Sequence, residues 1–405
     1  MAEKYCSKIE EVRFSSNRYV LVLPGWYPTL QDPFLGDFNQ RQVKAAGLET
    51  PQVVLYIVKD QSKTLTGIET RYKQVTENIV EITVTYPAKK NKWIDIFHSN
   101  LSYIRLLYEY AEIVRKRWGK PALIHSYIVM RGGLGGLLLG KRWKLPFILS
   151  EHWTIYYPAD PGYLPKRNFL FNWAVKRVFN NLACFLPVTN NLKQQVDRLI
   201  GPVPATIVPN VVDTDLFFYP HPEPEEENFQ FIHVSTMTSQ KNPQGLLRCF
   251  KRFQELHPKT RLQMVGPYPR GVLDYARSLG LIDRQVHFTG AVSYERVAAC
   301  LKASRALVLF SRYENLPCVI LEALCCGLPV ISTAVGGIPE VINNNNGILV
   351  DSDDDEKLIM AFVKLYTTYN SFNRTEIALK ATNAYSYKCI GSLINTVYRS
   401  LNLPG

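Results

Sequence analysis

The sequence predicts an α/β protein with two domains, each built on an open and mostly parallel sheet. The chain has 405 residues, a length that suits two domains better than one. Short apolar runs typical of buried strands alternate with helical segments in both halves. A Pro- and Glu-rich segment at residues 219–228 is typical of a linker between the two halves.

The first half, which we assign to a domain at residues 1–212, contains most of the predicted strands. Apolar runs predict strands at 18–23, 51–59, 122–127, 146–150, 184–188 and 205–208, and alternation predicts two more within 70–86. Helices are predicted at 39–46, 96–118, 132–140 and 191–199. The loop between the first strand and the first helix is rich in Pro, Gly and aromatic residues.

A second domain is assigned to residues 213–387, followed by a C-terminal segment at 388–405. Strands are predicted at 229–235, 261–266 and 286–290, with helices at 243–255 and 272–279. The last segment contains a helical pattern at about 388–401.

Composition limits where the protein works. The chain has no run of about 18 uncharged apolar residues, so no transmembrane helix is expected. Its first 16 residues carry charge without an apolar core, unlike a secretory signal. The eight cysteines include no C-x-x-C pair, which suits a reducing compartment. We therefore expect a cytoplasmic protein.

The net charge of +12 and the pI near 9.2 call for an acidic partner. Nucleic acid, anionic lipid and a phosphorylated substrate all qualify, and a merely soluble basic protein is equally compatible with charge alone. The sequence has no zinc-finger or aromatic RNA-binding signature, so we expect no nucleic-acid partner.

The stretch at 306–350 organises the chain. Residues 306–310 form a short apolar strand pattern, and a helix is expected over 319–326. Pro317 fits the first turn of that helix, with Asn315 or its neighbour as the cap. A second strand follows at 329–332, so the two strands should be parallel with a right-handed crossover.

The start of this helix is a predicted anion site. Unpaired backbone N–H groups at a helix N-terminus favour an anion such as a diphosphate. We therefore expect the segment of Leu316, Pro317, Cys318 and Val319 to lie against a nucleotide diphosphate.

Two carboxylates flank the same place. Glu314 lies in the loop, Glu322 lies inside the helix, and each can accept paired hydroxyl donors of a sugar ring. We interpret Glu314 as binding a transferred sugar and Glu322 as binding a nucleotide ribose. On spacing alone, a capping carboxylate and a mid-helix surface Glu explain the pattern more often.

The surroundings of the two glutamates carry a family resemblance. The stretch resembles the signature of retaining glycosyltransferases of family 4 (group 1), in which a strand ends in Ser and is followed by E-x7-E, Gly-Pro-Val, GG-x-PE and G-x-L-V. This chain shows the corresponding residues in that order: Ser311, Glu314, Glu322, Gly327, Pro329, Val330, Gly336, Gly337, Pro339, Glu340, Gly347, Leu349 and Val350.

The resemblance implies the GT-B architecture, an α/β fold of two Rossmann-like domains facing across a cleft. The first domain would bind the acceptor and the second the nucleotide sugar, with the helix at 388–401 crossing back to the first domain. It also implies that His152 reaches the transferred sugar and that the loop of Gly36 closes over the donor phosphate. His125 is a weaker candidate of the same kind.

Lys241 lies at a strand-to-helix turn, where a cation suits a diphosphate, although a surface Lys at a helix start is equally compatible.

The chain departs from the family signature at two points. Family members usually carry an Arg five or six positions before Lys241, where this chain has Ser235 and Thr236. Arg312 is a possible substitute for that cation, suggested by its position alone. The usual Gly of the junction at 209–217 is Val211, so its left-handed backbone is expected to be absent.

We expect a retaining glycosyltransferase that moves a sugar from a nucleotide sugar to a glycan or lipid-linked acceptor, in polysaccharide or glycolipid biosynthesis. No cofactor or metal is expected, because the acidic run at 351–355 is placed to cap a helix. A sugar-nucleotide epimerase or a phosphorylase on the same fold remains an alternative. So does a non-catalytic basic protein that binds membrane or nucleic acid.

Two basic and aromatic segments point to a membrane surface. One runs through Lys89, Lys90, Lys92 and Trp93, and the other, at 156–185, interleaves cations with aromatic residues. Such composition fits peripheral attachment to the inner face of an anionic membrane. A helix with a solvated basic face explains the first segment slightly better.

Overall fold

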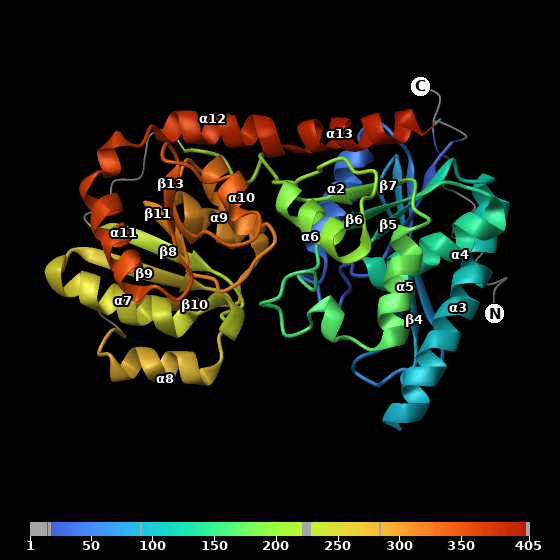
Figure 1. The fold of residues 1–405 in the computed structure, drawn as a ribbon, viewed down its shortest axis with the longest axis horizontal. Coiled ribbons are helices and arrows are strands. Elements are labelled where there is room, and N and C mark those ends of the chain that lie inside the picture. Colours follow the sequence, from blue (N-terminus) through green and yellow to red (C-terminus); the bar gives the residue numbers. More distant parts are fainter. Residues whose placement is uncertain (1–13, 15–17, 90, 221–227, 283–284, 402–405) are drawn as a thin grey trace.

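The computed structural model describes residues 14, 18–89, 91–220, 228–282 and 285–401. The chain forms two lobes, each with its own sheet, and two consecutive helices run across both lobes along one side (Figure 1). The expected α/β class with two parallel-sheet domains is confirmed.

The first sheet has seven strands in the order β3-β4-β2-β1-β5-β6-β7. They are β1 (Val20–Pro24), β2 (Gln52–Lys59), β3 (Glu69–Thr76), β4 (Ile79–Tyr86), β5 (Leu123–Tyr127), β6 (Phe147–Glu151) and β7 (Cys184–Pro187). Every pairing is parallel except that of β3 with β4. The carboxyl ends of the parallel strands therefore share one edge, where α/β proteins bind ligands.

Helices connect these strands. They are α2 (Asp37–Ala46), α3 (Lys92–Trp118), α4 (Leu134–Trp143), α5 (Phe169–Phe179) and α6 (Asn190–Ile200). The turn at Val129–Gly133 leads into α4 and holds two non-glycine residues at positive φ nearby, Ile128 at 67° and Arg131 at 57°. Strained backbone of this kind often accompanies a functional site.

The second sheet has six strands, all parallel, in the order β10-β9-β8-β11-β12-β13. They are β8 (Phe229–Val234), β9 (Thr260–Val265), β10 (Val286–Gly290), β11 (Ala306–Leu309), β12 (Val330–Thr333) and β13 (Gly347–Val350). The helices are α7 (Pro243–Leu256), α8 (Arg270–Ser278), α9 (Tyr294–Lys302), α10 (Cys318–Cys325) and α11 (Asp355–Thr367). The predicted parallel unit of β11, α10 and β12 is confirmed.

The chain returns to the first domain through α12 (Arg374–Tyr385) and α13 (Tyr387–Ser400) (Figure 1). On α13, the Asn395 amide donates to the Ala46 carbonyl of α2 over 3.1 Å. The helices approach so closely that a Cβ on Gly391 would lie 2.2 Å from the Ala45 carbonyl oxygen. The predicted return of the C-terminal helix is therefore what the structure has.

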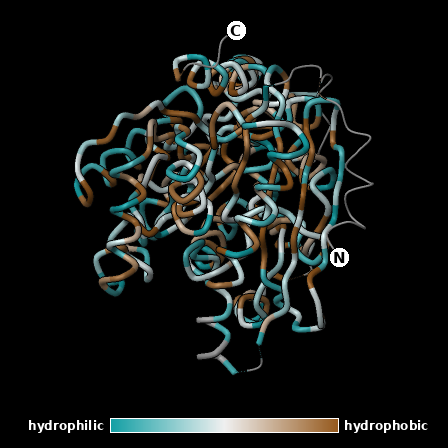
Figure 2. Tube along the Cα trace, turned by 90° about the vertical axis from the view of Figure 1, so that its right-hand side faces the viewer, coloured by the Kyte–Doolittle hydropathy of each residue, from teal (hydrophilic) through white to brown (hydrophobic). Residues whose placement is uncertain are grey.

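The domain boundary assigned at 212/213 stays a prediction. Val212 pairs with Ser386 in an isolated bridge, so the outgoing and returning segments cross at the same place. Apolar strand segments run through the middle of the molecule (Figure 2), and in the first domain the fully buried side chains include Leu21, Leu149 and Phe185.

Two local expectations were wrong or incomplete. The segment at 205–208 is not a strand: it runs beside β7 and forms an isolated bridge from Ala205 to Phe185. Helices α5, α9 and α12 were not predicted, and α12 has a weak apolar stripe that explains its omission. A third expectation is confirmed, since Val211 does not adopt the positive φ that a Gly would allow.

Part of the predicted linker, residues 221–227, lies outside the described residues, as do Cys6 and Lys90. The described cysteines are all free thiols. In the described part of the chain, no helix is both long and apolar enough to cross a membrane.

Candidate active site

The second domain brings Glu314 and Lys241 together. Glu314 is buried in the loop between β11 and α10, and Lys241 ends a short 3-10 turn before α7. The Lys241 ammonium forms a salt bridge with Glu314 Oε1. The Gln240 amide donates to the Tyr313 carbonyl over 2.9 Å, which ties the two loops together. The sequence predicted both residues for one site, and the fold places them in direct contact.

The cap predicted for α10 was wrong. Pro317 occupies the N-cap position, and no side chain caps the helix. Asn315 instead offers its Oδ1 to two residues of the first domain, Thr189 Oγ1 at 3.3 Å and Tyr157 Oη at 3.4 Å. Because its side chain is used across the domain interface, Asn315 leaves the first N–H groups of α10 free of a side-chain cap, as an anion site requires.

Gly336 fixes the backbone of Glu314. Its φ is 57°, and a Cβ at this position would lie 2.0 Å from the Glu314 carbonyl oxygen. Next to it, the Gly337 N–H donates to the Asn315 carbonyl over 2.9 Å. The Gly-Gly pair of the family signature therefore holds the carboxylate loop by close backbone contact.

Glu322 lies buried on α10 and contacts residues from both domains. Its Oε1 accepts a hydrogen bond of 2.7 Å from Tyr294 Oη, and Arg41 Nη2 lies 3.8 Å from the same oxygen. Burial raises the pKa of Glu322, while Arg41 and Tyr294 act against that rise. Sequence analysis predicted Glu322 but missed Arg41 and Tyr294, because α2 and α9 approach it only in the folded chain.

His152 follows β6 at the carboxyl edge of the first sheet, as expected. Its ring lies 4.6 Å from Phe38 and 6.4 Å from Tyr127, measured between centroids. Burial lowers the pKa of His152 to about 3, although the nearby Asn210 amide opposes the decrease. Neither ring nitrogen makes a hydrogen bond of normal geometry within the described residues. The imidazole is therefore neutral, and its buried nitrogens have no regular hydrogen-bond partner among these residues.

Glu151 positions His152, and sequence analysis gave it no role. Its carboxylate is fully buried and accepts 2.9 Å hydrogen bonds from the backbone N–H groups of His152, Trp153 and Val129. Tyr156 Oη donates a fourth, at 3.0 Å. The signal available in the sequence was a Glu at the end of a predicted buried strand, directly before a His. A carboxylate buried there must find several hydrogen-bond donors.

His125, the weaker candidate, belongs to the core. Its Nδ1 lies 2.7 Å from Tyr398 Oη on α13, and its Nε2 lies 2.9 Å from Ser150 Oγ. Burial lowers its pKa to about 3. Nδ1 thus attaches α13 to the first sheet and Nε2 joins β5 to β6, so neither nitrogen is left for a ligand.

Gly36 begins α2 with a left-handed backbone, φ 67° and ψ 25°. A Cβ here would lie 2.5 Å from the backbone of Trp26, so this glycine is needed for the loop itself. The turn alone is therefore sufficient to explain a glycine here, and the approach of Gly36 to a donor phosphate stays a prediction.

Arg312 does not replace the missing family Arg. Its guanidinium contacts Asp353 at 3.0 Å, the Ser239 carbonyl at 2.6 Å and Asn242 Oδ1 at 3.1 Å. These contacts hold the loop that carries Lys241. They also use the side chain, so Arg312 acts on the site through the loop.

The acidic run at 351–355 is engaged in capping and ion pairs. Asp354 accepts a 3.0 Å hydrogen bond from the Lys357 N–H at the start of α11, and Asp351 pairs with the Lys357 ammonium. Among the described residues, no group of three or more His, Cys, Asp or Glu side chains could hold a metal ion.

The two domains contact each other at this site. Glu340 of the second domain accepts hydrogen bonds from the first N–H groups of α6, from Asn190 at 2.9 Å and Asn191 at 2.6 Å. Asn210 Nδ2 donates to the Leu316 carbonyl over 2.8 Å. Together with the Thr189–Asn315 contact, these bonds bring the loops before α6 and α10 together. His152 lies near Asn210.

A cavity of about 700 Å³ opens at the carboxyl edge of the first sheet. It lies beyond the ends of β1, β2 and β5 and is lined by Trp26, Lys59, Arg131 and Trp153, among others. The two indole rings lie 5.4 Å apart, edge to face. Aromatic rings with nearby cations suit a sugar or a phosphorylated headgroup.

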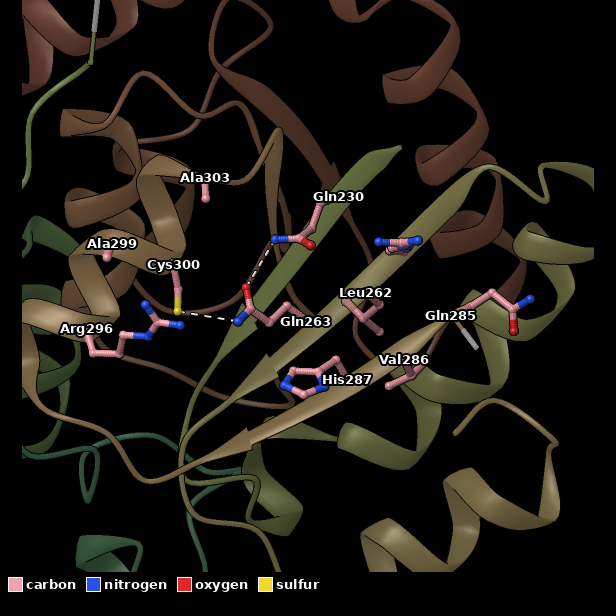
Figure 3. A pocket seen from close by; sticks show the side chains of 11 residues that line it. Gln230, Leu262, Gln263, Gln285, Val286, His287, Arg296, Ala299, Cys300 and Ala303 are labelled. Atoms are coloured by element: carbon pink, nitrogen blue, oxygen red, sulfur yellow. Dashed lines mark hydrogen bonds between the residues drawn. The ribbon is translucent and has the colours of Figure 1, made fainter. Parts of the chain in front are cut away.

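Figure 3 shows a second cavity of about 600 Å³, in the second domain. Its lining includes Gln230, Gln263 and His287, near the beginnings or middles of β8, β9 and β10, with Cys300 from α9. The site residues lie beyond the opposite ends of the parallel strands, so this cavity is separate from the interdomain site.

Two protein-family models match adjoining parts of the chain. The model of "Glycosyltransferase Family 4" matches residues 68–216, and that of "Glycosyl transferases group 1" matches residues 217–378. The chain belongs to the group 1 glycosyltransferases.

Relatives and solved structures agree with this assignment. A phosphatidylinositol N-acetylglucosaminyltransferase component of Arabidopsis thaliana is 27% identical over 200 residues, 49% of this chain and 44% of that protein, so the match spans less than half of this relative's length. Two solved structures share the fold over nearly the whole chain. They are sucrose-phosphate synthase from Thermosynechococcus elongatus (TM-score 0.74, 17% identity, 95% of this chain and 99% of that chain) and Anabaena Alr3699/HepE in complex with UDP (TM-score 0.72, 16% identity, 94% and 100%).

Proposed function

We propose that this protein transfers a sugar, with retention of anomeric configuration, from a nucleotide sugar to a lipid-linked or otherwise amphiphilic glycan acceptor. The observation that carries the proposal is the convergence of Glu314, Lys241, Glu322 and the uncapped start of α10 opposite His152. The solved relative in complex with UDP supports a nucleotide-sugar donor, and the relative named for phosphatidylinositol supports a lipid acceptor.

In this proposal each residue has a defined task. Glu322 binds ribose hydroxyls, Glu314 and the neutral His152 bind the transferred sugar, and Lys241 faces the diphosphate. The bond from the anomeric carbon to the diphosphate oxygen breaks, and a bond to the acceptor oxygen forms on the same face. The acceptor proton passes to the departing diphosphate. Negative charge grows on that leaving group, and Lys241 with the α10 N–H groups stabilises it.

Incubation with a radiolabelled nucleotide sugar and a membrane-lipid extract tests the reaction and its need for metal together. We expect label to enter the lipid fraction equally in excess EDTA and in added magnesium or manganese, because cationic and N–H groups replace a metal at the diphosphate. Loss of transfer in EDTA that metal restores would contradict metal independence. Conversion of donor to an epimer or a sugar phosphate would contradict glycosyl transfer.

The exposed face of α5 suits a membrane-bound acceptor. Phe169, Leu170 and Trp173 are 78%, 73% and 56% exposed, respectively. The exposed cations Lys166, Arg167, Lys176 and Arg177 flank them. Phe171 of the same helix lies 6.3 Å from Trp153, which lines the first-domain cavity. An acceptor held at a bilayer on this face would therefore reach the cavity.

The first basic segment contributes no structural support for membrane attachment, since Lys90 and the side chains of Lys92 and Trp93 lie outside the described residues.

Vesicle co-sedimentation tests this peripheral attachment. The wild type is expected to bind anionic vesicles and to leave them in high salt, since each cation near anionic lipid contributes about 1 kcal/mol. The double variant Leu170→Ser/Trp173→Ser should bind more weakly, because it loses apolar area. The matched control is Leu256→Ser/Met360→Ser, two exposed apolar residues of the second domain. Equal binding by both variants, or equal binding of the wild type to neutral and anionic vesicles, would contradict the attachment.

A further inference from the structure

Family members carry a second cation for the diphosphate near position 236, and this chain has Thr236 there. Lys241 is then the one side-chain cation that the sequence firmly predicted for the diphosphate. Sequence position suggested Arg312, but that guanidinium is bound to Asp353 and to the loop of Ser239. A second candidate lies on the other domain. Arg41 projects from α2 and is buried against the start of α10, with a side chain only 7% exposed.

Arg41 lies beside the proposed ribose contact, Glu322, and its charge acts on the proposed sugar contact, His152. Its Nη2 lies 3.8 Å from Glu322 Oε1, and its guanidinium carbon lies 4.9 Å from the centre of the Tyr294 ring. Its charge also reaches Cys318, the first residue of α10, whose pKa it lowers against a rise caused by burial. It lowers the pKa of His152 as well, a smaller effect than that of burial. A diphosphate that joins a ribose at Glu322 to a sugar at His152 would pass beside this guanidinium.

The guanidinium has unused binding capacity. Nη1 donates to Asp37 Oδ2 over 2.8 Å, which orients the side chain along α2. Nε is buried and has no hydrogen-bond partner within the described residues. The contact with Glu322 is long for an ion pair. Buried donors are normally paired, so an unpartnered Nε at the edge of a predicted anion site indicates that a ligand completes it.

We propose that Arg41 binds the donor diphosphate and supplies from the first domain the cation that other family members carry near position 236. This inference rests on the proposed function and deepens it. Because α2 and α10 belong to different domains, the diphosphate would be fully neutralised only when the domains are together. Burial lowers the pKa of Arg41, but Cys318, Asp37 and its other acidic neighbours raise that pKa by more. The net change is an increase, so Arg41 stays cationic.

Calorimetric titration of the full chain tests the proposal. Wild type is titrated with UDP, GDP and ADP, and then with the nucleoside that corresponds to the tightest diphosphate. Arg41→Gln should weaken diphosphate binding by about 10- to 100-fold, the loss typical of a hydrogen bond to a charged group, and leave nucleoside binding within about twofold. Lys44→Gln, which also replaces a cation of α2 by glutamine, is the control and should match the wild type.

Restoring the family cation sharpens the test. Arg41→Gln/Thr236→Arg should recover at least part of the diphosphate affinity, whereas an Arg41 that merely joins the domains would not be replaced from position 236. If Arg41→Gln does not fold, as judged by its melting transition, Arg41→Lys should weaken diphosphate binding about 3- to 10-fold, because it loses the planar fork.

The outcomes separate the two claims. Wild-type diphosphate affinity in the Arg41 variants, or an equal loss of nucleoside and diphosphate binding, would overturn the role of Arg41 and leave the proposed function standing. Failure of the wild type to bind any of the three diphosphates would overturn both.

Discussion

Glu314→Gln is expected to lower sugar transfer by at least about 100-fold, the loss typical when a group that stabilises a transition state is removed. The carboxylate is buried, fixed by Gly336 and paired with Lys241, so it is preorganised for a sugar that carries developing charge. The glutamine keeps an oxygen that can accept from Lys241. Binding of the nucleoside diphosphate should therefore change by only a few-fold.

Initial rates of transfer and calorimetry of the purified variant decide this. Glu356→Gln, an exposed carboxylate paired with Arg252 on the second domain, is the matched control and should behave like the wild type. If diphosphate affinity and transfer fell by the same factor, Glu314 would be a structural residue of the Lys241 loop.

Gly336→Ala is expected to have the next largest effect. The alanine must adopt φ near 57°, a region that costs L-residues about 1–2 kcal/mol, and its Cβ would lie 2.0 Å from the Glu314 carbonyl oxygen. The carboxylate loop must therefore shift, and transfer should fall about as far as in Glu314→Gln, together with a lower free energy of unfolding.

Urea unfolding and transfer rates measure both consequences. Gly271→Ala is the control, since a Cβ there meets nothing within 4 Å and its φ is ordinary. That variant should stay within about 0.5 kcal/mol of the wild type and keep its activity. A fully active Gly336→Ala protein would show that the Glu314 loop need not be held in this position.

The sequence predicted the parts of the site that lie on one continuous stretch. Glu314, Glu322 and the start of α10 come from a single strand–helix–strand unit, and the unit formed as expected because its apolar runs and its Gly327 stop, at φ 70°, are local signals. Lys241 was predicted for the same site on its own local signal, and it contacts Glu314 because β8 and β11 are neighbours in the sheet.

The sequence did not predict the roles of residues that act through contacts between the two domains. Arg41 was predicted only as part of a helix, and Asn315 was taken for a cap although its side chain faces Thr189 and Tyr157. Their roles depend on how two separate sheets pack, and hydrophobic periodicity within each domain carries no information about that packing. Glu340 likewise appeared only as a motif residue until the structure placed it at the start of α6.

Calorimetric titration of the wild-type protein with nucleoside diphosphates in EDTA tests the central claim most directly, because it needs no acceptor. The account predicts that one of UDP, GDP and ADP binds at one site per chain, and that Lys241→Ala and Glu322→Gln each weaken that binding. Absence of binding by all three, or binding that neither substitution changes, would contradict a donor site built from these residues.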